Sequence, residues 1–396
     1  MSNWVLVVNC GSSSVKFALV DPESGNESFH GIAERLGQGS QAGEITYQYG
    51  DEKERHSLPD GKHEQALADI VEKLHSLGWL EQVVAVGHRV VHGGEYFSDS
   101  VRIDENVRDK IADCIRLAPL HNPAHVIGID AAKAAFPDLP QVAVFDTAFH
   151  QYMPEHAYLY ALPYEMYREH GIRRYGFHGT SFRYVAVRTQ TLLDNANAKL
   201  VIAHLGNGGS VAAVDGEHSL DTTMGLTPLE GLVHGTRSGD IDPAIPYLLT
   251  EQFAMDAKAV NDMLWKESGL LGLSELSNDC RTLEQAMDEG NEAAKRALDV
   301  YIYRLAKHIA GQMVALGGTD ALVFTGGIGE NSSYVRAEVV KLLAFMGFAL
   351  DSAKNEATNR GAEANIASAQ SRPVWVVPTN EELMIARDTV RLMEQG

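Results

Sequence analysis

Apolar and polar residues follow two periods along the chain, and segments of each kind alternate from one end to the other. Short runs of β-branched and other apolar residues predict buried strands, whereas apolar residues spaced three and four apart predict amphipathic helices. The alternation predicts an α/β fold. The predicted strands lie at 5–8, 15–20, 44–49, 83–91, 141–145, 320–325 and 374–377, with two more within 199–215. The predicted helices lie at 62–77, 106–117, 124–135 and 291–316 and after 382.

The stretch Val5–Asp21 places one glycine and three serines between two apolar runs, which predicts a strand, a tight turn and a second strand. The turn offers the hydroxyls of Ser12 and Ser14, backbone N–H groups and the ammonium of Lys16. Donors that converge in this way favour an anion, and phosphate is the anion we expect. An ordinary serine-rich hairpin explains the segment equally well. Lys16 lies inside the second strand and does not open a helix, so this is not a Walker loop.

The same pattern recurs in Lys199–Asp215, where an apolar strand, a Gly/Asn/Ser turn and a second strand again end in Asp. The second copy is one residue shorter between its first strand end and its closing Asp (Asn9 to Asp21, His204 to Asp215). The repetition of this strand-turn-strand pattern indicates a duplicated domain. We expect the two turns to face each other across a cleft and to hold the two ends of one polyphosphate.

Composition and charge narrow the classes of function. The 396 residues suffice for two domains, and 45% hydrophobic with 22% charged residues is a globular balance. We expect neither a membrane span nor a signal peptide, because no apolar run is long enough and the first residues lack a basic head. A net charge of −20 argues against nucleic acid or an anionic membrane as partner. Three cysteines at unrelated spacings fit neither disulfides nor a metal site and favour a reducing cytosol.

Charged side chains stand at the ends of two predicted strands. Arg89 lies within an apolar strand that runs into Gly93-Gly94, and it is costly to bury without an anion beside it. A structural carboxylate could be that anion, but we favour a substrate, because the glycines allow close approach. Asp146 follows the last apolar residue of its strand, where α/β sheets bind ligands. It is a candidate for catalysis or metal orientation, and its alternative role is capping.

Glycine-rich segments mark three further places in the second half of the chain. The stretch 225–243 surrounds one arginine with many glycines, and it indicates a loop shaped to present Arg237. The stretch 320–331 predicts a buried strand, a glycine-rich turn and a helix starting at Ser332. A nucleotide could lie against the bare backbone of this turn, although tight packing is its other explanation. His178 stands between Gly176-Phe177 and a predicted helix N-cap, a position that by itself does not indicate function.

Taken together, these stretches resemble the acetate kinase family, a branch of the superfamily of acetate and sugar kinases, Hsp70 and actin. The resemblance runs nearly end to end, through 9–16, 88–94, 146–150, 175–181, 204–209, 225–243, 326–331 and 379–382. It implies two duplicated actin-like ATPase (ribonuclease H-like) domains around a nucleotide cleft, at 1–150 plus 384–396 and at 151–383, in a cytoplasmic homodimer. His234 departs from the family pattern, which leads us to expect an apolar residue there; it could lie behind Arg237.

The resemblance also assigns roles to individual residues. It implies catalytic roles for Asp146, His178 and Arg237. The carboxylate substrate would contact Arg89, Val91, Leu120 and Pro228. A Mg²⁺ ion, with Mn²⁺ as the alternative, would contact Asn9 and Glu381. ATP or ADP would contact Lys16, His204, Leu205, Gly206, Asn207, Gly208, Asp279, Cys280, Arg281, Gly327, Ile328, Gly329, Glu330 and Asn331, with phosphate contacts at Ser12 and Ser14.

Three functions fit these expectations. The first is reversible, direct in-line phosphoryl transfer from MgATP to acetate, giving acetyl phosphate and ADP. A carboxylic acid with a pKa of about 4 is already ionised and needs no general base, so we hypothesise that Asp146 orients Mg²⁺ or its water. The second is a kinase for propionate or another short acid, which branched Val91 disfavours. The third is an actin- or Hsp70-like ATPase switch, against which Arg89 and Arg237 argue, since water as nucleophile would not require them.

Overall fold

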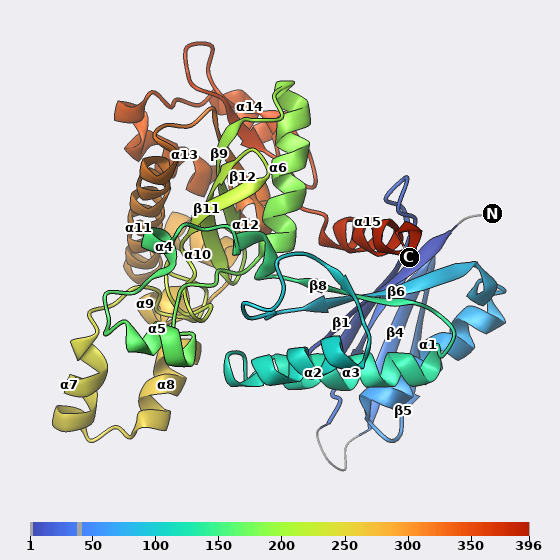
Figure 1. Cartoon of the computed structure of the whole chain (residues 1–396). Helices are drawn as coiled ribbons and strands as arrows, with labels where there is room; N and C mark the ends of the chain where they lie inside the picture. Colours follow the sequence, from blue (N-terminus) through green and yellow to red (C-terminus); the bar gives the residue numbers. More distant parts are fainter. Residues whose placement is uncertain (1–2, 38–41, 396) are drawn as a thin grey trace. The chain divides into compact units, whose positions relative to one another are not determined.

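The computed structural model describes residues 3–37 and 42–395 and divides the chain into two compact units (Figure 1). Unit 1 comprises residues 1–151 and 380–396, and unit 2 comprises residues 152–379. Residues 1, 2, 38–41 and 396, which belong to the predicted first domain, lie outside the described residues. None of the described helices is both long and apolar enough to cross a membrane.

The described part of unit 1 is built on an eight-stranded sheet with the order β5-β4-β3-β2-β1-β6-β8-β7. The strands β1 to β5 form an antiparallel meander, β1, β6 and β8 run parallel, and β7 is an antiparallel edge strand. Their bounds are β1 Trp4–Cys10, β2 Ser14–Val20, β3 Glu27–Glu34, β4 Gly43–Tyr49, β5 Glu52–Leu58, β6 Val83–Val90, β7 Val101–Arg102 and β8 Gln141–Phe145.

Helices cover both faces of this sheet. α1 (His63–Ser76) and α3 (Asn122–Ala135) pack on the face that carries Leu6, Val8 and Cys10. α15 (Glu381–Glu394) packs against β1, β6 and β8 on the opposite face, as Figure 1 shows. An added Cβ at Gly87 of β6 would lie 2.7 Å from side-chain atoms of Ile385 and Thr389, so glycine lets α15 approach the strand closely.

The described part of unit 2 has a six-stranded sheet with the order β11-β10-β9-β12-β14-β13. Its bounds are β9 Lys199–Leu205, β10 Gly209–Asp215, β11 His218–Thr222, β12 Ala321–Thr325, β13 Ala364–Asn365 and β14 Val374–Val376. α11 (Glu292–Leu316) buries Leu298, Leu305 and Ile309 against one face. α6 (Gly179–Leu193) packs on β9 from the other face (Figure 1).

The two sheets share one topology. The strand order is β3-β2-β1-β6-β8 in unit 1 and β11-β10-β9-β12-β14 in unit 2. In each sheet adjacent strands among the first three of this order are antiparallel, and the last two run parallel to the middle strand, β1 or β9. The predicted hairpins are the first two strands of each: Asn9 pairs with Lys16, and His204 with Ser210. The prediction of a duplicated actin-like α/β fold is therefore confirmed.

The remaining helices connect these strands. They are α2 Glu105–Asp113, α4 Glu155–Tyr158, α5 Glu165–His170, α7 Ala244–Phe253, α8 Ala257–Lys266, α9 Gly269–Ser274, α10 Cys280–Asp288, α12 Gly326–Asn331, α13 Ser333–Leu342 and α14 Ser352–Ala357. The single-turn 3₁₀ helices are η1 Leu80–Gln82, η2 Cys114–Arg116, η3 Ala148–His150 and η4 Ala344–Met346.

The structure corrects three local predictions. The glycine-rich turn at 326–331 is the short helix α12, because Gly326, with a φ of 76°, turns the chain after β12 and the side chains of Glu330 and Asn331 bond to the backbone of Gly326 and Gly327. The helix predicted at 106–117 ends at Asp113 and continues as η2. The helix N-cap expected after His178 is His178 itself, and its side chain does not make the capping bond.

Unit 1 buries histidines that must stay neutral. Burial, together with the nearby charge of Arg89, lowers the pKa of His125 to about 3. Neither ring nitrogen of His125 has a hydrogen-bond partner among the described residues. Because the unfolded side chain has a pKa of about 6.5, its contribution to stability is intact above that pH. The contribution is lost progressively as the pH falls toward the folded pKa.

We predict that His125→Leu removes this dependence. The free energy of unfolding of the variant should lie within about 1 kcal/mol of the wild-type value at pH 7. At pH 5 it should exceed the wild-type value by about 2 kcal/mol. Urea unfolding at both pH values measures the difference. Ile129→Val, which removes one buried methyl group from the same helix, should cost about 1 kcal/mol at both pH values. If both variants were less stable than the wild type by the same free energy at pH 5, the prediction would be contradicted.

Candidate functional site

In unit 1, four of the expected site residues lie at the carboxyl ends of parallel strands or beside them. Asn9 is near the end of β1, Arg89 is near the end of β6, and Asp146 follows β8 directly. Backbone pairing fixes their register, because the Asp146 N–H donates to the Val90 carbonyl at 3.0 Å. Glu381, the first residue of α15, lies 3.8 Å from Arg89. The fold therefore brings together residues that are far apart in the sequence.

Arg89 does have a carboxylate partner within the protein. Its Nε donates to Oδ1 of Asp146 at 3.0 Å and its Nη2 to Oδ2 at 2.8 Å. Asp146 is 3% exposed and Arg89 is 25% exposed, so the pair is largely shielded from water. The charge of Asp146 raises the pKa of the Arg89 guanidinium further. Nη1 makes no hydrogen bond to any described residue, which leaves one edge of the guanidinium available to an anion.

Negative charge exceeds positive charge at this end of the sheet. Burial, with the added charges of Asp146 and Glu382, raises the pKa of Glu381 to about 7, although Arg89 opposes the shift. The described residues contain no group of three or more His, Cys, Asp or Glu side chains able to hold a metal ion. Mg²⁺ usually binds one or two carboxylates and keeps its other positions for water and phosphate. The hard oxygens of Asn9 and Glu381, in this excess of negative charge, fit such an ion.

The first hairpin places Lys16 next to this group. Lys16 is exposed and pairs across the strands with Asn9, so both side chains lie on the sheet face that α15 partly covers. A cavity of about 380 Å³ is lined by Asn9, Lys16 and Glu382, among others. Ser12 is exposed in the turn, whose Gly11 N–H donates to the Ser14 carbonyl at 2.7 Å. Of the expected apolar contacts in unit 1, Val91 is buried and Leu120 is 63% exposed.

In unit 2, His178 is held in an uncommon backbone conformation. Its φ of 59° is in the left-handed region, where residues other than glycine are rare. The imidazole hydrogen-bonds through Nδ1 to the Ser210 hydroxyl at 2.8 Å and stacks on His204 with ring centroids 4.3 Å apart. Contacts from two strands thus fix the ring at the start of α6.

A second set of hydrogen bonds ties the ends of β9 and β12 together. Nδ1 of His204 lies 2.8 Å from the Ser181 hydroxyl, which lies 2.7 Å from the hydroxyl of Thr379. Oε1 of Glu330 accepts from the N–H groups of Gly326 and Thr379 at 2.9 and 3.1 Å. His204 and Glu330 therefore hold the framework of this region, and neither lines the cavity beside it.

The cavity beside β9 and β12 has a volume of about 720 Å³ and opens between α10 and α12. It is lined by the turn after β9, the start of α10 and the exposed side of α12. An added Cβ at Gly327 would meet no described atom within 4 Å, so bare backbone faces open space there. Among the expected nucleotide contacts it is lined by Gly206, Asn207, Asp279, Cys280, Arg281, Gly327, Ile328 and Asn331. Its other lining residues are Asn278, Ser332, Asn359 and Arg360.

The remaining expected nucleotide contacts lie elsewhere. Leu205 and Gly329 are buried, and Gly208 lies against Arg237, where an added Cβ would be 3.1 Å from Nη1. Lys16 belongs to unit 1. Burial raises the pKa of the Cys280 thiol, so this cysteine contributes to the lining as a neutral group.

Arg237 is a partly buried cation without an acidic partner. Its Nη1 donates to the Pro228 carbonyl at 3.0 Å, and its guanidinium lies over Trp265, 5.4 Å from the ring centroid. No described carboxylate lies within 4.0 Å of it, and burial lowers its pKa. A guanidinium held in this way favours an external anion.

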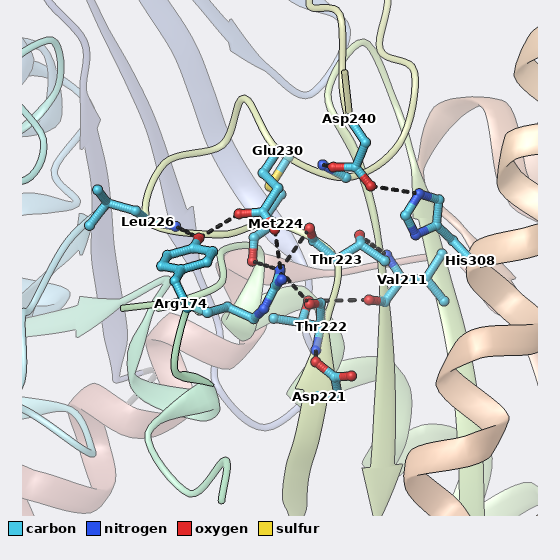
Figure 2. A network of polar contacts seen from close by, with 12 residues as sticks. Arg174, Val211, Asp221, Thr222, Thr223, Met224, Leu226, Glu230, Asp240 and His308 are labelled. Atoms are coloured by element: carbon cyan, nitrogen blue, oxygen red, sulfur yellow. Dashed lines mark hydrogen bonds and ion pairs between the residues drawn. The ribbon is translucent and has the colours of Figure 1, made fainter. Parts of the chain in front are cut away.

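Figure 2 shows the network that fixes the loop carrying Pro228 and Arg237. Nη2 of Arg174 donates to Oε1 of Glu230 at 2.6 Å, and the Tyr160 hydroxyl donates to the other oxygen of Glu230. Nη1 of Arg174 donates to the carbonyls of Thr222, Thr223 and Met224 at 3.0, 3.0 and 3.2 Å. An added Cβ at Gly225 would lie 1.6 Å from Glu230, so only glycine lets this carboxylate pass.

The other end of the same loop is tied to α11. Oδ1 of Asp240 accepts from the Gly231 N–H at 2.8 Å, and Oδ2 lies 3.4 Å from Nε2 of His308 (Figure 2). These anchoring residues are not among those predicted from the sequence. A carboxylate between apolar residues and glycine, as at Glu230, was the available signal, but its partners are 56 and 70 residues away along the chain.

The duplicated sheets, with polar groups gathered where parallel strands end, define a two-domain α/β protein of the actin-like ATPase class. The model of the Acetokinase family matches residues 4–387. The chain belongs to this family.

Individual relatives are similar over almost their whole length. An acetate kinase of Dichelobacter nodosus is 61% identical over 389 residues, 98% of each chain. Two solved structures superpose closely. The crystal structure of Porphyromonas gingivalis acetate kinase has a TM-score of 0.94 at 44% identity, covering 99% of this chain and 100% of that one. That of a propionate kinase from Francisella tularensis has a TM-score of 0.93 at 45% identity, with the same coverage.

The network around Glu230 predicts a local loss of stability when its charge is removed. Glu230→Gln should lower the free energy of unfolding of unit 2 by about 2 kcal/mol, because Arg174, only 18% exposed, loses its counter-ion. Glu363→Gln is the matched control, because it breaks a two-bond pair with Arg188, which is 43% exposed, and should cost at most about 0.5 kcal/mol. Calorimetric unfolding compares the two variants. Equal losses would contradict a structural role for Glu230.

Proposed function

We propose that this protein is an acetate kinase, which transfers the γ-phosphoryl group of MgATP to acetate and gives acetyl phosphate and ADP, reversibly. A carboxylate oxygen of acetate forms the new bond to phosphorus while the bond from phosphorus to the β–γ bridging oxygen breaks. Charge balances without any proton transfer, because the acid is ionised at neutral pH. The observation that carries the proposal is Arg237, a partly buried guanidinium with no acidic partner among the described residues.

Phosphoryl transfer depends mainly on alignment and on neutralising the charge of the transferred group. Within unit 2, Arg237 is suited to pair with that group, and His178 would donate a hydrogen bond to its oxygens. Gly206, Asn207 and Gly327 would hold the nucleotide in the cavity that they line. The apolar face of Pro228 would contact the methyl group of acetate.

Within unit 1, the outer edge of Arg89 would bind the carboxylate of acetate, and Val91 would add an apolar contact. Asn9 and Glu381 would hold Mg²⁺, which supplies positive charge to the phosphates. Lys16, Ser12 and Ser14 would bind phosphate oxygens. Mn²⁺ has the same preference for oxygen ligands and is the alternative ion.

The runner-up is a kinase for propionate or another short acid. The similar structure from Francisella tularensis, which is that of a propionate kinase, supports propionate as the acid in this alternative. One methylene in an apolar pocket changes binding by about 1–3 kcal/mol, so both acids could react at different rates. A nucleotide switch of the actin or Hsp70 kind stays the distant alternative. It would hydrolyse ATP without any acid, and Arg89 would then have no carboxylate substrate to bind.

The deciding experiment measures ADP formation from MgATP with acetate, propionate, butyrate or no acid, with hydroxylamine present to trap acyl phosphate. We expect turnover that requires an acid, trapped product, and the highest kcat/KM with acetate. A maximum with propionate would establish the runner-up. Equal ADP formation with and without acid would reject both kinase functions.

Asp146 provides a test of the metal-orienting role. Asp146→Asn should lower kcat by at least about tenfold and raise the Mg²⁺ concentration needed for half-maximal rate, since a negative charge beside the ion is lost. Asp130→Asn is the matched control. It alters a two-bond pair with Arg108 at the surface, where Asp130 is 50% exposed, and should leave both values unchanged. An unchanged Mg²⁺ dependence in Asp146→Asn would refute the role.

The helix α7 supports a homodimer. It has no buried residue, and its apolar side chains are unusually exposed: Tyr247 is 70%, Phe253 65% and Leu248 42% exposed. Figure 1 shows α7 and α8 as a helical hairpin that extends from the body of unit 2. An exposed apolar helix of this kind fits a second copy of the chain. The three cysteines are free and buried, which supports a reducing cytoplasmic location.

We predict that Tyr247→Glu converts the dimer to a monomer, because a charge on α7 would have to be buried at the interface. Light scattering after size-exclusion chromatography gives the mass directly. Tyr96→Glu, at a residue of unit 1 that is 50% exposed, should leave the dimer intact. A Tyr247→Glu protein with twice the mass of the chain would exclude α7 from the interface.

A further inference from the structure

The segment that carries Arg237 is packed directly on the turn that follows β9. The Gly235 N–H donates to the Asn207 carbonyl at 2.8 Å. An added Cβ at Gly235 would lie 2.0 Å from the side chain of Asn207, and an added Cβ at Gly208 would touch Arg237. The candidate nucleotide turn 206–208 and the candidate anion-binding Arg237 therefore share one contact surface within unit 2.

His234 joins the two segments through its side chain. Its Nδ1 accepts a hydrogen bond from the Gly209 N–H, the first backbone N–H of β10, at 3.0 Å. The imidazole is 1% exposed, and burial lowers its pKa to about 3, so the ring is neutral and carries its hydrogen on Nε2. The ring also lies near the backbone carbonyls of Glu230 and Leu229, which oppose this lowering of the pKa. The contact of Nδ1 with the Gly209 N–H is the interaction that links the ring to β10.

The backbone of His234 is fixed as well. Its N–H donates to the Arg237 carbonyl at 3.2 Å, and its carbonyl accepts from the Leu270 N–H at 2.8 Å. The ring therefore extends from a closed turn that ends at Arg237 and rests on α9. The bond from Gly209 to His234 therefore links the backbone that carries Arg237 to the start of β10.

We propose that His234 is a positioning residue, whose bond to Gly209 sets the spacing between Arg237 and the nucleotide turn 206–208. An apolar residue at this position would fill the same volume, but only an acceptor at Nδ1 binds the Gly209 N–H. The proposal rests on the proposed function, in which the turn binds ATP phosphates and Arg237 binds the group in transfer.

The consequence differs from that of simple loss of packing. Without the bond, the turn can still bind nucleotide and Arg237 can still bind an anion, so binding of either ligand alone should change little. Phosphoryl transfer requires both groups in one alignment, and small misplacements slow chemistry strongly. The effect should therefore appear in kcat and not in the affinity for nucleotide.

Two variants separate the bond from the packing. His234→Leu keeps apolar volume and removes the acceptor, whereas His234→Asn places an amide oxygen where Nδ1 lies. We expect His234→Leu to lower kcat for acetyl phosphate formation by about tenfold with less than about a twofold change in the Kd of ADP. We expect His234→Asn to stay within about twofold of the wild-type kcat. If His234→Leu does not fold, His234→Gln, whose longer amide points away from Gly209, replaces it.

Steady-state kinetics and calorimetric titration with ADP give both quantities for each protein. A wild-type kcat in His234→Leu would overturn the proposal. So would a loss in His234→Asn equal to that in His234→Leu, or a tenfold weaker Kd for ADP. Failure of the proposed function is a separate result, because the wild type itself would then form no acyl phosphate.

Discussion

An uncompensated positive charge is the constraint on which unit 2 depends. Arg237 is partly buried, has no acidic partner among the described residues, and is held by the Pro228 carbonyl and the face of Trp265. Such a group is costly to the folded protein unless an anion binds there. The loop around it is accordingly fixed at both ends, by Glu230 between Arg174 and Tyr160 and by Asp240 beside His308. The ion pairs of this loop do not neutralise Arg237; they fix the position of the backbone that carries it.

In unit 1, by contrast, the arginine of the site is paired with carboxylates of the protein. Arg89 is bound by Asp146 through two hydrogen bonds and is close to Glu381, so carboxylates outnumber guanidinium groups at the strand ends. The same topology, three antiparallel strands followed by two parallel ones, thus supports an excess of negative charge in unit 1 and a free positive charge in unit 2. A divalent cation complements the first, and an anion complements the second. In the proposed function, MgATP supplies the cation, and the phosphoryl group in transfer is the anion.

Sequence patterns predicted those parts of the molecule whose chemistry is local. The two hairpins, the buried strands and the stripe of α11 follow from apolar spacing, and Arg89 and Asp146 were recognisable because polar residues end apolar strands. β5 was not predicted, since Glu52–Leu58 is a mostly charged edge strand stabilised by pairing with β4. The positive φ of His178 and the bonds of Glu230 depend on segments distant in sequence. Periodicity carries no information about such contacts.

The central claim is that the charge of Arg237 is kept for an anion at the expense of stability. The most direct test compares thermal unfolding of the wild type and Arg237→Met, alone and with acetyl phosphate. Methionine fills similar space without charge, so the account predicts a higher Tm for the ligand-free variant, no further rise with acetyl phosphate, and no acid-dependent turnover. A lower Tm for the ligand-free variant, with stabilisation by acetyl phosphate and turnover retained, would contradict it.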